Sequence, residues 1–213
     1  MFQKSFGTSG VNAIGSFQLS QLNSSSVQSK LKAAGINTNS KQYKAAVKQM
    51  MSAGNGAMYG NIQGIKNLMS HYDKDGDYIN PVNGLAGLLV TDENESSRKR
   101  IISIPDSSKE EMYELTKKEF LRENGVHNGD TIKRTDVYNN LYRKMSKKDR
   151  LAAGYTLEKY ERIYRQAFYD AAKKADPDWK IGKPIKAGAL DDVTRESAET
   201  GKSPAQATLD TKI

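Results

Sequence analysis

Three segments of this sequence share one helical signature, which restricts the chain to a mainly α-helical fold. Residues 24–35, 39–54 and 107–125 each begin with serine or asparagine, whose side chains accept hydrogen bonds from the free amides of a first helical turn. Each segment ends at a glycine, which adopts the left-handed conformation that closes many helices. Between these ends, apolar residues recur at spacings of three and four, as they do on one face of a helix.

Three further apolar stripes predict helices at residues 62–72, 134–145 and 154–176. The last of these stripes ends at an Asp-Pro pair, because proline cannot continue a helix. In the segment over residues 107–125, Ser107 or Ser108 is the expected cap. The side chains expected to face inward from this segment are Met112, Leu115, Thr116 and Phe120.

The best candidate for a strand is a short extended run at residues 101–105, and residues 87–90 are its expected partner in a β-hairpin. A chain of 213 residues is long enough for one core of ordinary size. We therefore expect a flexible or partner-ordered N-terminal arm at residues 1–24, a single helical domain at residues 25–177 and a polar C-terminal extension at residues 178–213.

The absence of cysteine excludes several classes of structure and chemistry. Disulfides, thiolate zinc sites and cysteine nucleophiles all require a residue that this chain lacks. The N-terminal residues show no basic region followed by an apolar run, so no signal peptide is expected. No later run approaches the roughly 18 consecutive apolar residues of a membrane span. We therefore expect a protein that is made in the cytoplasm and does not span a membrane.

The net charge of +8 is concentrated at the start of the chain. Residues 1–72 contain no aspartate or glutamate, and their basic residues are Lys4, Lys30, Lys32, Lys41, Lys44, Lys48 and Lys66. These lysines are spread among polar residues and are not accompanied by arginine, which argues against nucleic acid as the partner. An acid-free segment can instead be a solvated polar face, or can dock on an acidic surface of a partner or of a second copy of the chain.

The N-terminal arm carries a small set of apolar side chains that predict self-association. Residues 1–24 are too polar to fold alone, so their apolar side chains are expected to anchor in a groove between the helices of another copy. These expected anchors are Phe2, Phe6, Ile14, Phe17 and Leu19. Donation of this kind from subunit to subunit gives a homo-oligomer when the rotation closes and a polymer when it does not.

The sequence DKDGDYIN at residues 73–80 places aspartates at alternate positions, as calcium-binding loops do. It resembles the start of an EF-hand or dockerin-type loop, which implies calcium as the cofactor. Asp73, Asp75 and Asp77 take the first three ligand positions of that pattern. The second half departs from it, because Tyr78 stands where the turning glycine belongs. The position of the bidentate glutamate falls on Gly84, or on Asn83 if one residue is deleted.

Two interpretations of this loop remain open from the sequence. In the first, the Ile79 carbonyl, the Asn80 or Asn83 amide oxygen and water complete a weak calcium site. In the second, the loop is a metal-free turn in which the aspartates accept hydrogen bonds from backbone amides. Magnesium fits less well, because its strict octahedral shell suits fewer protein ligands together with substrate phosphates.

No catalytic motif accompanies the loop, and the only histidines, His71 and His127, lie in no nucleophile or metalloprotease pattern. The leading functional hypothesis is therefore a non-enzymatic structural or interaction protein that self-associates through its acid-free N-terminal segment. The first alternative is a calcium-dependent binding module that uses the Asp73 to Asp77 loop. The second alternative is an enzyme whose carboxylate site is assembled from distant helices.

Several phrases of the sequence resemble an uncharacterised protein family of spore-forming Gram-positive bacteria over nearly the whole chain. They are LKAAGINTNSKQYKAAVKQM, NIQGIKNLMSHYDKDGDYINPVNGL, VHNGDTIKRTDVYNNLY and LEKYERIYRQAFYDA. The resemblance implies a bacterial source, and hence synthesis in a bacterial cytoplasm. It implies no function and no residue roles.

Overall fold

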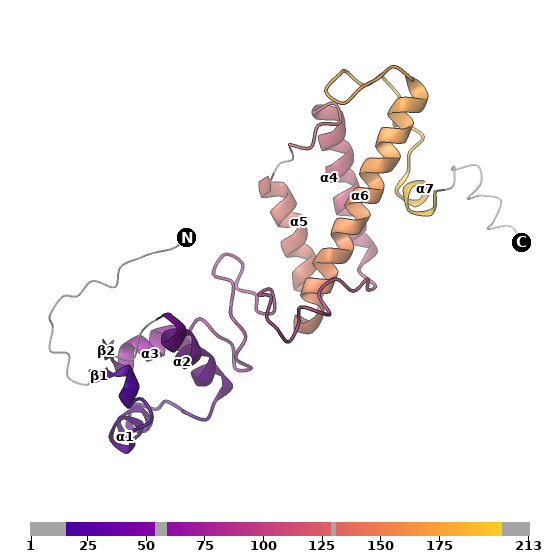
Figure 1. Ribbon diagram of the computed structural model, residues 1–213. Helices are drawn as coiled ribbons and strands as arrows, with labels where there is room; N and C mark the ends of the chain where they lie inside the picture. Colours follow the sequence, from indigo (N-terminus) through magenta and orange to yellow (C-terminus); the bar gives the residue numbers. More distant parts are fainter. Residues whose placement is uncertain (1–15, 54–58, 129–130, 202–213) are drawn as a thin grey trace, which may run out of the picture. The chain divides into compact units, whose positions relative to one another are not determined.

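A computed structural model describes residues 16–53, 59–128 and 131–201, and the chain divides into two compact units, Met1–Leu89 and Val90–Ile213 (Figure 1). Helices dominate both units, so the predicted mainly α-helical class is confirmed. Each unit buries its own hydrophobic cluster, which differs from the single core expected from the sequence. The spacing of apolar residues identifies the apolar face of each helix, but it carries no information on which helices pack against each other. Among the described residues, no helix is both long and apolar enough to cross a membrane.

The N-terminal unit is built from three helices and a two-stranded pair. The helices are α1 (Ser25–Ala33), α2 (Lys41–Ala53) and α3 (Ile62–Met69), and strand β1 (Phe17–Gln18) pairs antiparallel with β2 (Tyr59–Gly60). Ser24 caps α1 as predicted, since its side chain accepts a hydrogen bond from the Val27 amide at 3.3 Å. The fully buried side chains of Leu31 and Ile65 lie at the centre of this unit's core.

The part of the N-terminal arm that the structure describes belongs to this core. Phe17, Leu19 and Leu22 are only 4%, 3% and 3% exposed and pack against the buried side chains of the same unit. This differs from the expectation that residues 1–24 have no fold of their own and that Phe17 and Leu19 anchor in another copy. The chain's own helices provide the apolar surface that the arm lacks in isolation. The other expected anchors, Phe2, Phe6 and Ile14, lie outside the described residues.

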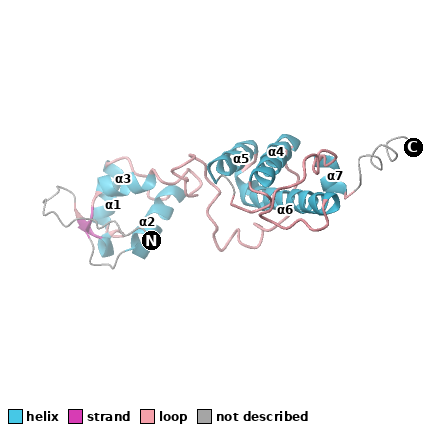
Figure 2. Cartoon of the chain, turned by 90° about the horizontal axis from the view of Figure 1, so that it is seen from above, coloured by secondary structure: helices cyan, strands magenta, loops and turns pink. Residues whose placement is uncertain are grey.

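The C-terminal unit is a bundle of three long helices with a C-terminal segment packed on it. Helices α4 (Asp106–Arg122), α5 (Thr131–Lys144) and α6 (Arg150–Ala175) lie side by side, and the short α7 (Arg195–Thr200) contacts α6 (Figure 2). The single-turn segment η2 (Lys147–Asp149) leads into α6. Met112, Thr116 and Phe120 face the core as predicted, and Leu115 is partly buried beside it.

The predicted hairpin between residues 87–90 and 101–105 is wrong, because the structure assigns neither segment to a strand. Residues 101–105 lie along the C-terminal bundle instead. The Ile102 amide donates to the Thr156 hydroxyl of α6 at 3.1 Å, and Ile104 is buried in the cluster. A side chain on a helix thus takes the hydrogen bond that a strand partner would have taken.

Residues 178–201 are a packed part of the C-terminal unit, in contrast to the polar extension expected there. Trp179 and Leu190 are each only 2% exposed. The indole of Trp179 lies 6.1 Å from the Phe120 ring and 5.7 Å from the Tyr169 ring, centroid to centroid. A few large side chains therefore order a segment whose average composition is polar. The last residues of the expected extension, 202–213, are outside the described part of the chain.

The start of α4 also differs from the prediction. The helix begins at Asp106 after Pro105, so Ser107 and Ser108 lie inside its first turn and neither is the cap. Ser108 is fully buried, and its hydroxyl has no hydrogen-bond partner among the described residues. A buried hydroxyl without a partner costs about 1–3 kcal/mol of desolvation.

Replacing Ser108 with alanine is therefore expected to leave the free energy of unfolding unchanged or to raise it by up to about 1 kcal/mol. The matched control is Thr156→Val. The Thr156 hydroxyl is buried, donates a hydrogen bond to the Ala152 carbonyl and accepts one from the Ile102 amide. That change should lower the free energy of unfolding by about 1–3 kcal/mol. Urea denaturation measures both values, and a loss above 1 kcal/mol for Ser108→Ala would contradict the interpretation.

Candidate metal centre

The Asp loop, residues 73–77, follows α3 after three residues and is closed by short backbone bridges. Tyr72 pairs with Tyr78 across the loop, and Ile79 pairs with Ala86 beyond it. The two tyrosine rings meet edge to face with centroids 5.9 Å apart. The loop is therefore a closed turn with fixed ends, as a set of convergent ligands requires.

The three aspartates converge within this turn. One carboxylate oxygen from each of Asp73, Asp75 and Asp77 lies within 4.8 Å of the other two. Two oxygens bound to one calcium ion at about 2.3–2.6 Å lie at most about 5 Å apart. The spacing therefore fits three ligands of a single hard cation. Asp75 is exposed and the other two are half-buried, so solvent can reach the cluster.

The same loop also shows the hydrogen bonds of the metal-free interpretation. Asp73 Oδ1 accepts from the amides of Asp75 and Asp77, each at 2.9 Å, and the Asp73 amide donates to the Asp77 carbonyl at 2.9 Å. An ionised carboxylate has two oxygens and about four lone-pair sites, so capping amides does not use up its capacity as a ligand. These hydrogen bonds hold the carboxylates in place in either interpretation.

Residues in the first turn of helix α2 contact the Asp loop and the residues that precede it. The Gln42 side-chain amide donates to the carbonyls of Met69 and Tyr72 at 3.0 and 2.8 Å. Gly76 has a φ of +86°, and a Cβ at this position would lie only 3.0 Å from the Lys41 carbonyl oxygen. Only glycine combines that conformation with so close an approach. The loop is thus fixed against the first turn of α2.

The ligands expected from the second half of the calcium-loop pattern lie in the turn that follows residues 73–77. Asn80 Oδ1 accepts from the Val82 amide at 2.9 Å, and Asn83 Oδ1 accepts from the Leu85 amide at 3.0 Å. Ile79 donates its amide to the His71 carbonyl at 2.8 Å. The structure thus brings together the three predicted aspartates and uses the two asparagines to build the turn that follows them.

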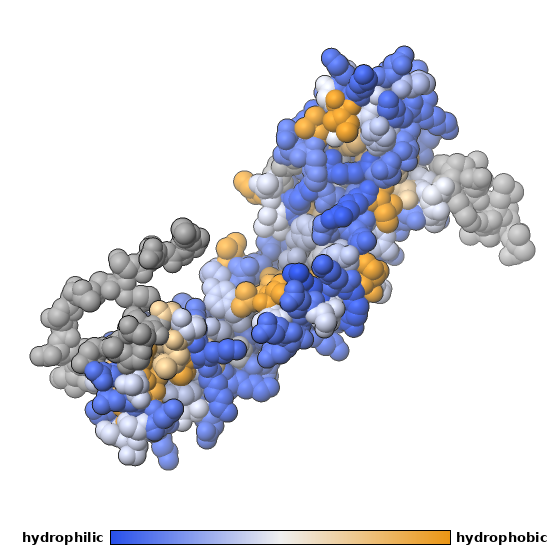
Figure 3. All heavy atoms as spheres, in the orientation of Figure 1, coloured by the Kyte–Doolittle hydropathy of each residue, from blue (hydrophilic) through white to orange (hydrophobic). Residues whose placement is uncertain are grey.

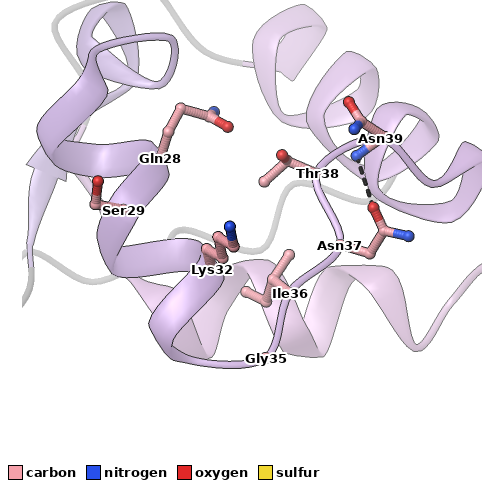
Figure 4. Close-up of a pocket in the computed structure, with 8 residues that line it drawn as sticks. All are labelled: Gln28, Ser29, Lys32, Gly35, Ile36, Asn37, Thr38 and Asn39. Atoms are coloured by element: carbon pink, nitrogen blue, oxygen red, sulfur yellow. Dashed lines mark hydrogen bonds between the residues drawn. The ribbon is translucent and has the colours of Figure 1, made fainter.

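A polar pocket of about 540 Å³ lies between α1 and the start of α2, and the sequence analysis did not find it (Figure 4). Its lining residues are Gln28, Ser29, Lys32, Gly35, Ile36, Asn37, Thr38 and Asn39. Asn37 Oδ1 accepts from the Asn39 amide at 3.0 Å, and Gln28 donates to the Leu22 carbonyl at 2.7 Å. These eight described residues include no carboxylate or histidine, and Lys32 is the ionisable side chain among them.

A second feature that the sequence did not predict is an ionic cluster in the C-terminal unit. Glu119 of α4 and Glu161 of α6 are only 1% and 5% exposed, and Arg134 of α5 bridges their carboxylates at 2.6 and 2.5 Å. Arg165 contacts the same two carboxylates at 3.4 and 3.3 Å. His127 Nε2 lies 3.5 Å from Glu161 at the exposed edge.

This ionic cluster brings together two carboxylates from distant helices, as the enzyme hypothesis requires, but arginines bind both of them. Burial lowers the pKa of Arg134, but Glu161 and Glu119 outweigh burial and raise this pKa above its usual value. The guanidinium therefore stays charged and paired. Such a cluster connects α4, α5 and α6 and presents no free carboxylate pair for acid and base catalysis.

Residues 36–213 match a protein family described as a domain of unknown function, DUF3879. No curated protein and no solved structure matches the chain. The match begins at Ile36, so it includes the Asp loop, α2 and the entire C-terminal unit. The prediction of an uncharacterised family is confirmed, while its bacterial source stays a prediction. The chain therefore belongs to the DUF3879 family.

Proposed function

We propose that this protein is a non-enzymatic, calcium-dependent interaction protein whose Asp loop binds one calcium ion. The observation that carries the proposal is the convergence of the Asp73, Asp75 and Asp77 carboxylate oxygens within 4.8 Å of one another. The bound ion would hold the loop and the adjoining turn in one conformation, and so would fix the surface that the N-terminal unit presents to a partner.

The donor set favours calcium over other cations. Carboxylates are hard oxygen ligands, and calcium accepts six to eight oxygens in flexible geometry, including water and backbone carbonyls. Repulsion among three neighbouring negative charges also favours a bound cation. Because no bidentate glutamate completes the site, we expect weak affinity, with a dissociation constant on the order of 10⁻⁴ M.

The other two functional hypotheses have less support. Self-association through the N-terminal arm relied on anchors that included Phe17 and Leu19, and these side chains are buried in their own unit. An enzyme would need a free carboxylate pair, whereas Glu119 and Glu161 are held by Arg134 and Arg165. The calcium hypothesis is supported by three carboxylate oxygens that already lie within 4.8 Å of one another.

Millimolar calcium should raise the melting temperature of the N-terminal unit, because a ligand that binds only the folded state stabilises that state. At a calcium concentration about one hundred times the dissociation constant, the gain is about 2.7 kcal/mol, or several degrees. Differential scanning calorimetry of the full chain in calcium and in chelator measures this gain.

The variant Asp73→Asn/Asp75→Asn/Asp77→Asn should lose the gain. The matched control removes three exposed acids elsewhere, Asp92→Asn/Glu93→Gln/Asp178→Asn, and should keep it. Identical melting curves in calcium and in chelator for the unmodified chain would refute the proposal.

A further inference from the structure

The C-terminal unit contains an open groove of about 910 Å³ along one side of α6. This α6 groove is lined on the helix by Ile163, Ala167, Ala171 and Ala175, and on its other wall by residues that include Ala189 and Val193. On the face shown in Figure 3, by contrast, apolar residues are exposed only in small, separate patches. The groove is a continuous feature, lined largely by apolar side chains, that could receive a partner.

The apolar residues on the α6 side of the groove follow each other at intervals of four, and polar residues of α6 line the groove beside them. Residues four apart form one row along a helix, so the three alanines form a shallow channel and Ile163 stands at one end of it. Ile163 is 40% exposed, which leaves a large apolar side chain in contact with water. Small side chains let a second helix approach closely, while a protruding isoleucine can fill space on that helix.

The rim of the groove carries opposite charges one helical turn apart. Asp170 and Lys174 both line the groove and are both exposed. Asp170 accepts a hydrogen bond from the Gln166 side chain at 2.8 Å, which orients its carboxylate. When two copies of α6 run antiparallel, the order of these charges is reversed in the second copy. Each Asp170 then lies near the Lys174 of the other copy, so the rim is complementary to itself.

We infer that the α6 groove is the interface of a homodimer, in which the α6 helices of two copies pack antiparallel about a twofold axis near Ala171. The three alanines of each copy face those of the other, and each Asp170 pairs with the opposite Lys174. The inference is independent of the calcium site, because it concerns residues of the C-terminal unit alone. It assigns self-association to a surface other than the N-terminal arm.

Single cysteines test the geometry directly, because the chain contains no natural cysteine. Ala171→Cys lies beside the proposed axis and should form a disulfide-linked dimer on mild oxidation. The control is Arg162→Cys, nine residues earlier and so on the opposite side of α6, where the arginine side chain is 70% exposed. It should cross-link at least about tenfold more slowly. Equal rates for the two variants would overturn the inference.

Charge reversal tests the proposed pairing independently. Asp170→Lys and Lys174→Asp should each weaken dimerisation about tenfold in sedimentation equilibrium, because like charges then face each other across the axis. The double variant Asp170→Lys/Lys174→Asp should restore the original affinity, since the charges are again opposite. Circular dichroism checks that each variant folds. A chain that stays monomeric at several hundred micromolar, or a double variant as weak as the single ones, would refute the interface.

Discussion

Replacing Arg134 with methionine is expected to lower the free energy of unfolding of the C-terminal unit by about 3–5 kcal/mol. Its guanidinium bridges Glu119 and Glu161, which are almost completely buried. Without Arg134, the two buried negative charges lose its short contacts, and the contacts that Arg165 makes to them are longer, at 3.4 and 3.3 Å. Removing one partner of a buried ionic cluster leaves uncompensated charge, so the loss exceeds the net contribution of the intact pair. Urea denaturation followed by the fluorescence of Trp179, the only tryptophan, measures this loss.

Two further variants distinguish buried charge from loss of packing. Arg162→Met removes an exposed ion pair with Glu158 on the same helix as Glu161 and should cost far less, because exposed ion pairs contribute little to stability. Adding Glu119→Gln and Glu161→Gln to Arg134→Met removes the uncompensated charges and should recover part of the lost stability. If Arg134→Met costs no more than Arg162→Met, the ionic cluster does not hold α5 in place.

Replacing Gly125 with alanine is expected to lower the free energy of unfolding by roughly 2–5 kcal/mol. Gly125 has a φ of +81°, which disfavours any residue with a Cβ. That Cβ would also lie 2.9 Å from Cη2 and 3.1 Å from Cζ2 of the buried Trp179 ring. The ring is only 2% exposed and has little room to move, so conformational strain and overpacking add together.

Gly182→Ala serves as the matched control for Gly125→Ala. Its φ of +87° imposes a similar conformational cost, but the nearest atom to its Cβ would be a Val126 methyl at 3.9 Å. We therefore expect a loss of about 1–2 kcal/mol from Gly182→Ala. The difference between the two variants isolates the contact with Trp179, and equal losses would show that the indole ring yields without cost. Trp179 fluorescence reports on the same contact.

Local sequence patterns predicted the helices well because the causes of a helix lie within a few residues. The Ser24 cap, the glycine that ends α1 and the inward positions of Met112, Thr116 and Phe120 all depend on neighbours within one or two turns. The Asp loop was predictable for the same reason. Its carboxylates converge within five residues of chain, so their spacing in the sequence already restricts their spacing in space.

The features that the sequence did not predict depend on contacts between distant residues. Phe17 is buried by helices that follow it, and Ile102 bonds to Thr156, 54 residues away. The convergence of Glu119 and Glu161 on Arg134 depends on the relative rotation of α4 and α6, which the apolar stripes of the two helices do not specify. The division into two cores has the same origin, since an apolar stripe does not identify the surface that covers it.

The most direct test of the central claim is a calcium titration of the full chain by isothermal titration calorimetry after removal of metal with a chelator. The account predicts saturable binding of one calcium ion per chain, with a dissociation constant on the order of 10⁻⁴ M. Binding should vanish in the variant Asp73→Asn/Asp75→Asn/Asp77→Asn and persist in Asp92→Asn/Glu93→Gln/Asp178→Asn. A chain that takes up no calcium at millimolar concentration, or a triple aspartate variant that binds as well as the unmodified chain, would contradict the account.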